Sequence, residues 1–164
     1  MRRKEKQIQN LKVLDELLRS APVCRIGLAP VVFEVGDGHP RDTRSGYPFV
    51  VPVHFVHTAG RIYIHSARQG RKIEMIRANP RVCVEIDEFL GLKSADKACS
   101  YGTRFRSLIA FGSARIVEKA VEKRRALGLL MEKYARRSFD FSKREIEKVA
   151  IIEIEIKEVT GKQG

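Results

Sequence analysis

The sequence contains no tryptophan, and three of its 164 residues are cysteine. An odd number of cysteines without disulfide spacing argues against a disulfide-stabilised secreted fold and favours a reducing cytoplasm. The longest apolar runs, such as 49–53, fall far short of the roughly 20 residues of a membrane span. The basic N-terminus precedes an amphipathic pattern instead of the apolar core of a signal peptide. We therefore expect a cytoplasmic protein that does not cross a membrane.

Motifs for several common chemistries are also missing. There is no Cys-x-x-Cys and no His-Glu-x-x-His, and His54 and His57 are expected on opposite faces of one strand, so no metal site is predicted. Without a Walker motif or a G-x-G-x-x-G, a nucleoside triphosphate or Rossmann dinucleotide site is not supported. Cys24 and Cys83 lie in strand-like runs and are expected to be small buried residues, whereas Cys99 lies in a loop.

The chain is strongly basic, because 32 Lys and Arg against 20 Asp and Glu give a net charge of +12. Such a surplus is compatible with nucleic acid, with an anionic small molecule, or with a well-solvated surface. A length of 164 residues suits one domain, which we expect to span 1–164.

The first half of the chain predicts a helix followed by strands. Apolar residues at helical spacing predict an N-terminal helix over about 7–20, and a first strand is expected over 23–28. A polar, Gly-rich stretch over 36–46 reads as a long loop. Two apolar segments, 48–57 and 61–65, flank a Gly-containing turn and predict a hairpin.

The second half alternates further strands with helices. Helices are expected over 70–78 and within about 119–148, where Ser142 and Glu145 fit a capping box. Strands are expected over 81–87, over 104–117 with a bend at Gly112, and over about 150–159, whereas 88–102 reads as irregular. The strands lack a regular βαβ order, so the pattern predicts an α+β protein, mainly β, with an antiparallel barrel or sandwich and helices outside it.

One strand-to-helix junction has the residues of an anion site. A strand ends at His65 and Ser66, and a helix begins at Gly70 with Arg71 and Lys72 in its first turn. Backbone N–H groups at a helix start, two cations and a hydroxyl together suit a phosphate. A solvated basic turn remains the alternative reading. His65 would lie beside this turn as a ring-contacting or proton-handling group, and we name it as the candidate catalytic residue.

A second polar cluster begins the long strand over 104–117. Alternation places Arg104 and Arg106 on one face and Phe105 and Ser107 on the other. These charges either protect a sheet edge or contact a ligand. Pro52 lies inside the segment over 48–57 and indicates an edge, a bulge, or a place where something other than a strand meets the backbone.

Several segments, in order, resemble one known family. The segments 48–55, 60–66, 70–72, 79–83 and 104–114 are similar to the core of the pyridoxamine 5'-phosphate oxidase-like split-barrel flavoproteins, in the nitroimidazole-resistance (Nim) branch. This resemblance covers nearly the whole chain. It implies a six-stranded antiparallel split β-barrel with peripheral helices, and a homodimer that binds FMN at the subunit interface. The implied activity is an FMN-dependent oxidoreductase acting on a small aromatic or nitro-type redox substrate.

The resemblance also implies which residues bind the cofactor. They are taken from the first flavin strand, the next strand end, the phosphate turn and the long strand: Val50, Val51, Pro52, Val53, His65, Ser66, Gly70, Arg71, Lys72, Arg106 and Ser107. The resemblance does not extend to oxidation of pyridoxamine phosphate, because Val50 and Phe55 stand where the oxidases have cations and the Trp-containing C-terminal segment is missing. Haem, a deazaflavin, or a nucleic-acid-binding role without catalysis are the alternatives, although nucleic acid is not the expected partner.

Overall fold

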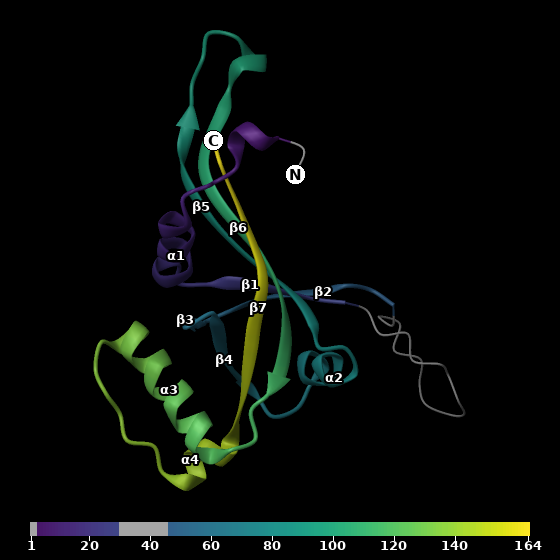
Figure 1. The fold of residues 1–164 in the computed structure, drawn as a ribbon, viewed down its shortest axis with the longest axis vertical. Coiled ribbons are helices and arrows are strands. Elements are labelled where there is room, and N and C mark those ends of the chain that lie inside the picture. Colours follow the sequence, from purple (N-terminus) through teal and green to yellow (C-terminus); the bar gives the residue numbers. More distant parts are fainter. Residues whose placement is uncertain (1–2, 30–45) are drawn as a thin grey trace.

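The structure, a computed structural model, describes residues 3–29 and 46–164 of the chain (Figure 1). The loop predicted over 36–46 falls almost entirely outside these residues. The described elements follow in chain order: η1 Lys4–Lys6, α1 Leu11–Ser20, β1 Cys24–Leu28, β2 Phe49–Val53, β3 Val56–Thr58, β4 Arg61–Ala67, α2 Arg71–Ala78, β5 Arg81–Lys93, η2 Ala98–Ser100, β6 Gly102–Ile116, α3 Ala120–Ala135, α4 Lys143–Lys148 and β7 Val149–Gln163.

All seven strands form one antiparallel sheet in the order β2-β1-β5-β6-β7-β4-β3. The prediction of six strands differs by one because the segment over 48–57 is broken at His54 and Phe55. Its first part, β2, pairs with β1, and its second part, β3, pairs with β4 across the predicted turn. The sheet therefore turns a corner at this break, and it does not close on itself, as expected for a split barrel.

The larger part of the core lies on one face of this curved sheet, and a smaller cluster around Ile151 lies on the other face beneath α3. Strand residues that alternate inward are fully buried, among them Ile26, Ile64 and Ile86. α1 covers part of this face, because its apolar residues Leu14 and Leu17 recur at helical spacing and are buried against the strands. Asn10 caps the helix by accepting a hydrogen bond from Lys12 N, so α1 begins at residue 11 and not near 7.

Only the middle of the segment over 88–102 is irregular, which corrects the expectation from its sequence in part. β5 continues to Lys93 and β6 begins at Gly102, and together they form a two-stranded arm that projects beyond the rest of the sheet (Figure 1). The pairing shifts register between Phe89 and Gly91. Along the arm, apolar side chains such as Phe89, Leu92 and Tyr101 are more than half exposed. The arm has no buried face, and so it shows no alternation of apolar and polar residues.

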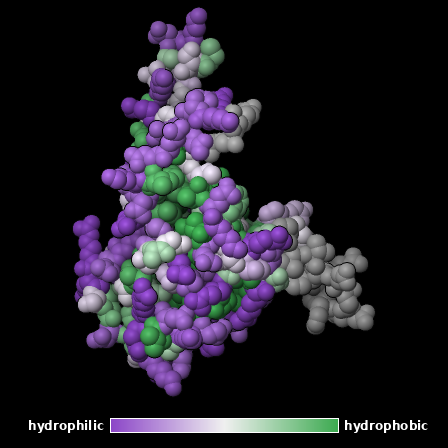
Figure 2. Space-filling view, viewed as in Figure 1, coloured by the Kyte–Doolittle hydropathy of each residue, from purple (hydrophilic) through white to green (hydrophobic). Residues whose placement is uncertain are grey.

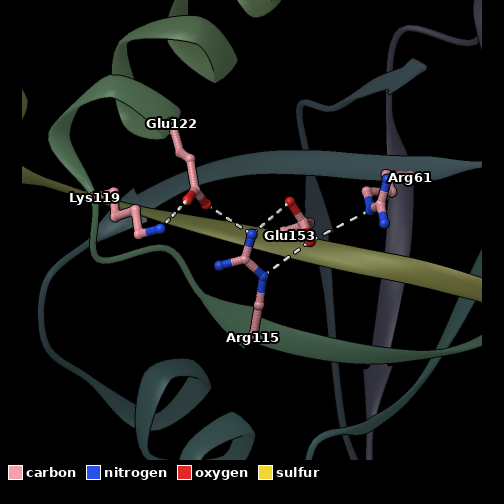
Figure 3. Close-up of polar contacts among 5 residues, drawn as sticks. All are labelled: Arg61, Arg115, Lys119, Glu122 and Glu153. Atoms are coloured by element: carbon pink, nitrogen blue, oxygen red, sulfur yellow. Dashed lines mark hydrogen bonds and ion pairs between the residues drawn. The ribbon is translucent and has the colours of Figure 1, made fainter. Parts of the chain in front are cut away.

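A charged network fastens α3 to the sheet at the end opposite the arm (Figure 3). Arg115 on β6 donates to both carboxylate oxygens of Glu153 on β7 at 2.9 Å, and also to Glu122 on α3 at 2.8 Å. Arg61 on β4 lies 3.5 Å from Glu153. Burial alone raises the pKa of Glu153, but hydrogen bonds from Arg115 and Tyr63 bring it below its usual value. The nearly buried Glu153 is therefore held as a carboxylate.

The helices near the C-terminal end agree with the capping pattern in the sequence. Ser142 and Glu145 form the predicted capping box at the start of α4. None of the helices within 3–29 and 46–164 combines the length and apolar character that a bilayer span requires.

Candidate functional site

The predicted anion site lies where β4 passes into α2. Gly70 precedes the helix with a φ of 113°, which is accessible to glycine but strained for other residues. Its carbonyl accepts hydrogen bonds from Ile73 N at 2.9 Å and Glu74 N at 3.2 Å, so the helix starts directly at Arg71. Arg71 and Lys72 are both half-buried in the first turn, where backbone N–H groups point out of the helix end. This turn can accept an anion.

Arg71 joins this turn to the edge strand β2. Its guanidinium lies 5.3 Å from the centre of the Phe49 ring, and its Nη2 donates to Tyr47 O at 3.5 Å. β2 pairs with β1 on one side and forms one edge of the sheet, so Pro52 occupies an edge strand, one of the positions that a proline tolerates. Val50, next to Phe49, is 61% exposed on the outer face of the sheet.

His65 and Ser66 complete this group from the end of β4. His65 is exposed at the end of β4, but partial desolvation lowers its pKa, and the nearby His54 and Lys72 lower it further by charge repulsion. Burial also lowers the pKa of Lys72. His65 is therefore a neutral imidazole near pH 7, able to hold or pass a proton, and Lys72 is a partly desolvated cation that would gain from an anionic partner.

Two residues of this region were not singled out as site residues from the sequence. The His54 ring lies 4.9 Å from the Tyr134 ring. The Tyr134 hydroxyl accepts a hydrogen bond from Phe55 N at 2.9 Å and can donate to Phe55 O or Pro22 O. α3 thus holds the break between β2 and β3 that brings His54 near His65. No local pattern could reveal this contact, because residues 54 and 134 are 80 positions apart.

Arg106 and Ser107 are not brought to this group within one chain. Ser107 pairs with Lys162 of β7, whereas His65 pairs with Ile151, eleven residues away along the same strand (162 − 151). At about 3.3 Å per residue this separation is roughly 35 Å. Arg106 donates to Glu88 at 2.9 Å and lies 3.4 Å from Glu16, so two carboxylates engage its guanidinium. That Arg106 and Ser107 bind the cofactor therefore stays a prediction, because a single chain does not bring them to the other site residues.

Cys24 and Cys99 lie as their sequence context predicts, whereas Cys83 is less buried than expected. Cys24 is buried and Cys99 is exposed, and Cys83 is partly covered on the outer face of the sheet. Burial raises the pKa of Cys24 to about 12, so its thiol is not a nucleophile at neutral pH.

Residues 12–163 match the family described as pyridoxamine 5'-phosphate oxidase, which is nearly the whole chain. Among solved structures, a candidate 5-nitroimidazole antibiotic resistance protein from Bacteroides thetaiotaomicron is 28% identical, with a TM-score of 0.78. The match covers 95% of this chain and 85% of that protein. A curated relative, an uncharacterized protein of Rhizobium meliloti strain 1021, is 39% identical over 46 residues. That alignment spans 28% of this chain and 30% of the relative's length.

Two more distant structures share the fold. A flavocytochrome from Azotobacter vinelandii is 21% identical with a TM-score of 0.80, and the match covers 100% of this chain and 72% of that one. A FAD- and haem-binding protein from Mycobacterium smegmatis is 19% identical with a TM-score of 0.79, covering 97% and 73% of the two chains. At these identities the likeness concerns the fold alone.

Proposed function

Because the chain belongs to the pyridoxamine 5'-phosphate oxidase family and has its open, antiparallel split-barrel fold, we propose that it is an FMN-binding oxidoreductase. The observation that carries the proposal is the group formed by Arg71, Lys72 and His65 beside the edge strand β2. Lys72 and the first turn of α2 would hold the phosphate, and Arg71 would bind it from the β2 side. The residues present therefore fit a phosphate-bearing cofactor.

The remaining site residues would contact the flavin ring, and His65 would supply a proton to it. The backbone of Val50, Val51, Pro52 and Val53 would lie along the flavin, and Ser66 would donate a hydrogen bond. A bound flavin supplies the electron-transfer chemistry. His65, whose pKa is lowered by partial desolvation and by the neighbouring Lys72, would hold a proton close to the ring. A His65→Ala protein that binds FMN normally and reduces nitroaromatic compounds as fast as the wild type would contradict this role.

We also propose that the protein acts as a homodimer with the cofactor at the subunit interface. The outer face of the sheet carries exposed apolar residues, with Val50, Phe111 and Phe89 each at least half exposed. A sheet face this apolar is typical of an interface. Ser107 lies on the same outer face, so a second copy could bring it to the group around His65. This arrangement explains why one chain leaves the two sets of site residues far apart.

The proposed substrate is a small aromatic or nitro-type compound in the cytoplasm. This is supported by the 28% identity to the candidate nitroimidazole resistance protein over 95% of the chain. The absorption spectrum of the purified protein separates the cofactors, since oxidised flavin gives two bands in the near ultraviolet and blue, a deazaflavin a different pair, and haem an intense Soret band. Released haem or deazaflavin in place of FMN would contradict the proposal.

A comparison of FMN with riboflavin, which lacks the phosphate, tests the residues directly. We expect the wild-type protein to bind FMN at least about tenfold more tightly than riboflavin in a fluorescence titration, because charge-assisted hydrogen bonds to the phosphate are lost with riboflavin. Lys72→Met should reduce this ratio towards one. Arg77→Met, in the exposed last turn of the same helix, is the matched control and should leave the ratio unchanged. If Lys72→Met leaves the ratio of the FMN and riboflavin affinities unchanged, residues other than Lys72 bind the phosphate.

A further inference from the structure

A pocket lies between α1, β3 and α3, apart from the group around His65. It is open to solvent, has a volume of about 330 Å³, and is lined by Arg19 from α1, by Val56 and His57 from β3, and by Leu129 and Lys133 from α3. The residues assigned to the flavin come instead from β2, β4, α2 and β6. A volume of this size lies at the lower end of the range for small-molecule sites.

His57 lacks a partner in the wall of this pocket. Its side chain is 10% exposed, and its Nδ1 is buried without a hydrogen bond to any described residue. The Oδ1 of Asp15 lies 3.7 Å from this nitrogen, beyond hydrogen-bonding distance. A buried nitrogen without a partner is costly, and because this one is closed to solvent, a ligand would supply its partner only after the imidazole ring turns toward the pocket.

Lys133 is a cation without an anion in the same pocket. Its ammonium donates to Ala21 O at 2.8 Å and lies 3.8 Å from the centre of the Phe55 ring. Among the described residues no carboxylate forms an ion pair with it, and burial lowers its pKa to about 8. Near pH 7 it remains charged and partly desolvated, so it would gain from a bound anion.

The other charges around the pocket offset each other. Arg19 is already paired with Asp15 at 2.7 Å, and Glu132 supplies a negative charge beside Lys133. A highly charged ligand such as a phosphate ester would therefore be poorly matched. Val56 and Leu129 add an apolar wall to the pocket.

We propose that this pocket is a second binding site, for a small monocarboxylic acid with an apolar body. One carboxylate oxygen pairs with Lys133, and the other accepts from His57 once its ring has turned toward the pocket, while the apolar body lies against Val56 and Leu129. This inference does not depend on the proposed flavin chemistry, because it uses none of the residues assigned to the cofactor.

Benzoate is the probe, titrated into the purified protein and followed by calorimetry and by NMR shifts of the residues in the pocket. We expect saturable binding that benzamide, which has the same shape but no charge, does not reproduce. Lys133→Met should weaken benzoate binding about tenfold or more, and His57→Phe should weaken it as well. Lys123→Met is the matched control, because Lys123 lies on the same helix and donates to a backbone carbonyl, Val149 O at 3.3 Å, outside the pocket.

A second variant tests the pocket without disturbing Lys133. Leu129→Trp fills the pocket and keeps the contacts of Lys133 with Ala21 and Phe55, so it should abolish benzoate binding while circular dichroism shows a folded protein. The proposal is overturned if the wild type binds no benzoate. It is also overturned if Leu129→Trp and Lys133→Met both bind benzoate as tightly as the wild type.

Discussion

Burial lowers the pKa of two histidines, His57 and His65, and this affects stability as well as chemistry. Desolvation is the leading cause in both cases. For His57, Asp15 acts in the opposite direction, whereas Arg19 and Lys133 add to the lowering. For His65, the additional repulsion comes from His54 and Lys72. The folded protein thus resists protonation at both imidazoles.

We therefore predict that the protein loses stability as the pH falls through 6.5, the ordinary pKa of histidine. Below that value the unfolded chain binds protons that the folded chain does not, so the free energy of unfolding declines until the lowered pKa values are reached. Urea unfolding at about pH 7.5 and about pH 5.5 measures this. His57→Gln should make the dependence shallower. Equal stability at the two pH values would show that burial does not perturb these imidazoles.

At the scale of the elements, the close approach of β6 and β7 depends on Gly112. A Cβ at this position would overlap Glu155 O, a backbone atom, and would lie 3.0 Å from Ile154 Cγ2. The register of β6 against β7 also shifts between Phe111 and Gly112, so the ladder is irregular at the position where the sequence predicts a bend.

Gly112→Ala should destabilise the protein by about 1–3 kcal/mol. The added methyl group would meet the backbone of β7, which cannot move aside as a flexible side chain would. Thermal or urea unfolding measures the effect. Gly128→Ala is the control, since a Cβ there meets nothing within 4 Å and alanine favours the helix. A neutral Gly112→Ala would mean that the two strands can separate at this point.

The elements that the sequence predicted well are those with one buried face. α3 and the strand Arg81–Asp87 within β5 show clear periodicity because one side contacts the core. The arm was missed because its apolar residues, such as Phe89 and Leu92, are exposed on a ribbon without a buried face. The break at His54 and Phe55 was missed because the apolar run continues across it. Among the site residues, Arg71 and Lys72 could be predicted from a helix start, but the contact of Tyr134 with His54 depends on tertiary packing.

For the whole molecule, the central question is what covers the outer face of the sheet. Phe111 is 50% exposed there, and Ile109, two residues before it on the same face, is 41% exposed. In the space-filling view hydrophobic side chains also lie open near the middle of the molecule, below the arm (Figure 2). Burying such a face against a second copy would release water from both surfaces.

We predict that Phe111→Lys converts the proposed dimer to a monomer in sedimentation experiments, and raises its dissociation constant by about 100-fold or more. Val121→Lys is the control, because Val121 is 77% exposed but belongs to the helix α3 and not to the sheet surface. If the cofactor needs both subunits, the monomeric variant should also bind FMN more weakly. A monomeric wild type, or a dimer unaffected by Phe111→Lys, would contradict the proposed interface.

The position of β7 has a consequence for how the chain folds as it is synthesised. β7 is the last strand in sequence, and it lies between β6 and β4, so it connects the part of the sheet that begins at β2 with the part that ends at β3. Until residues 149–163 emerge from the ribosome, β3 and β4 can form only their hairpin, and the edge of β4 remains open. The two parts of the barrel therefore join late, through long-range pairing that is intrinsically slow. During that interval only its own turn stabilises the nascent hairpin. In the cell, the open edge of β4 must be kept from pairing with the exposed strands of other chains.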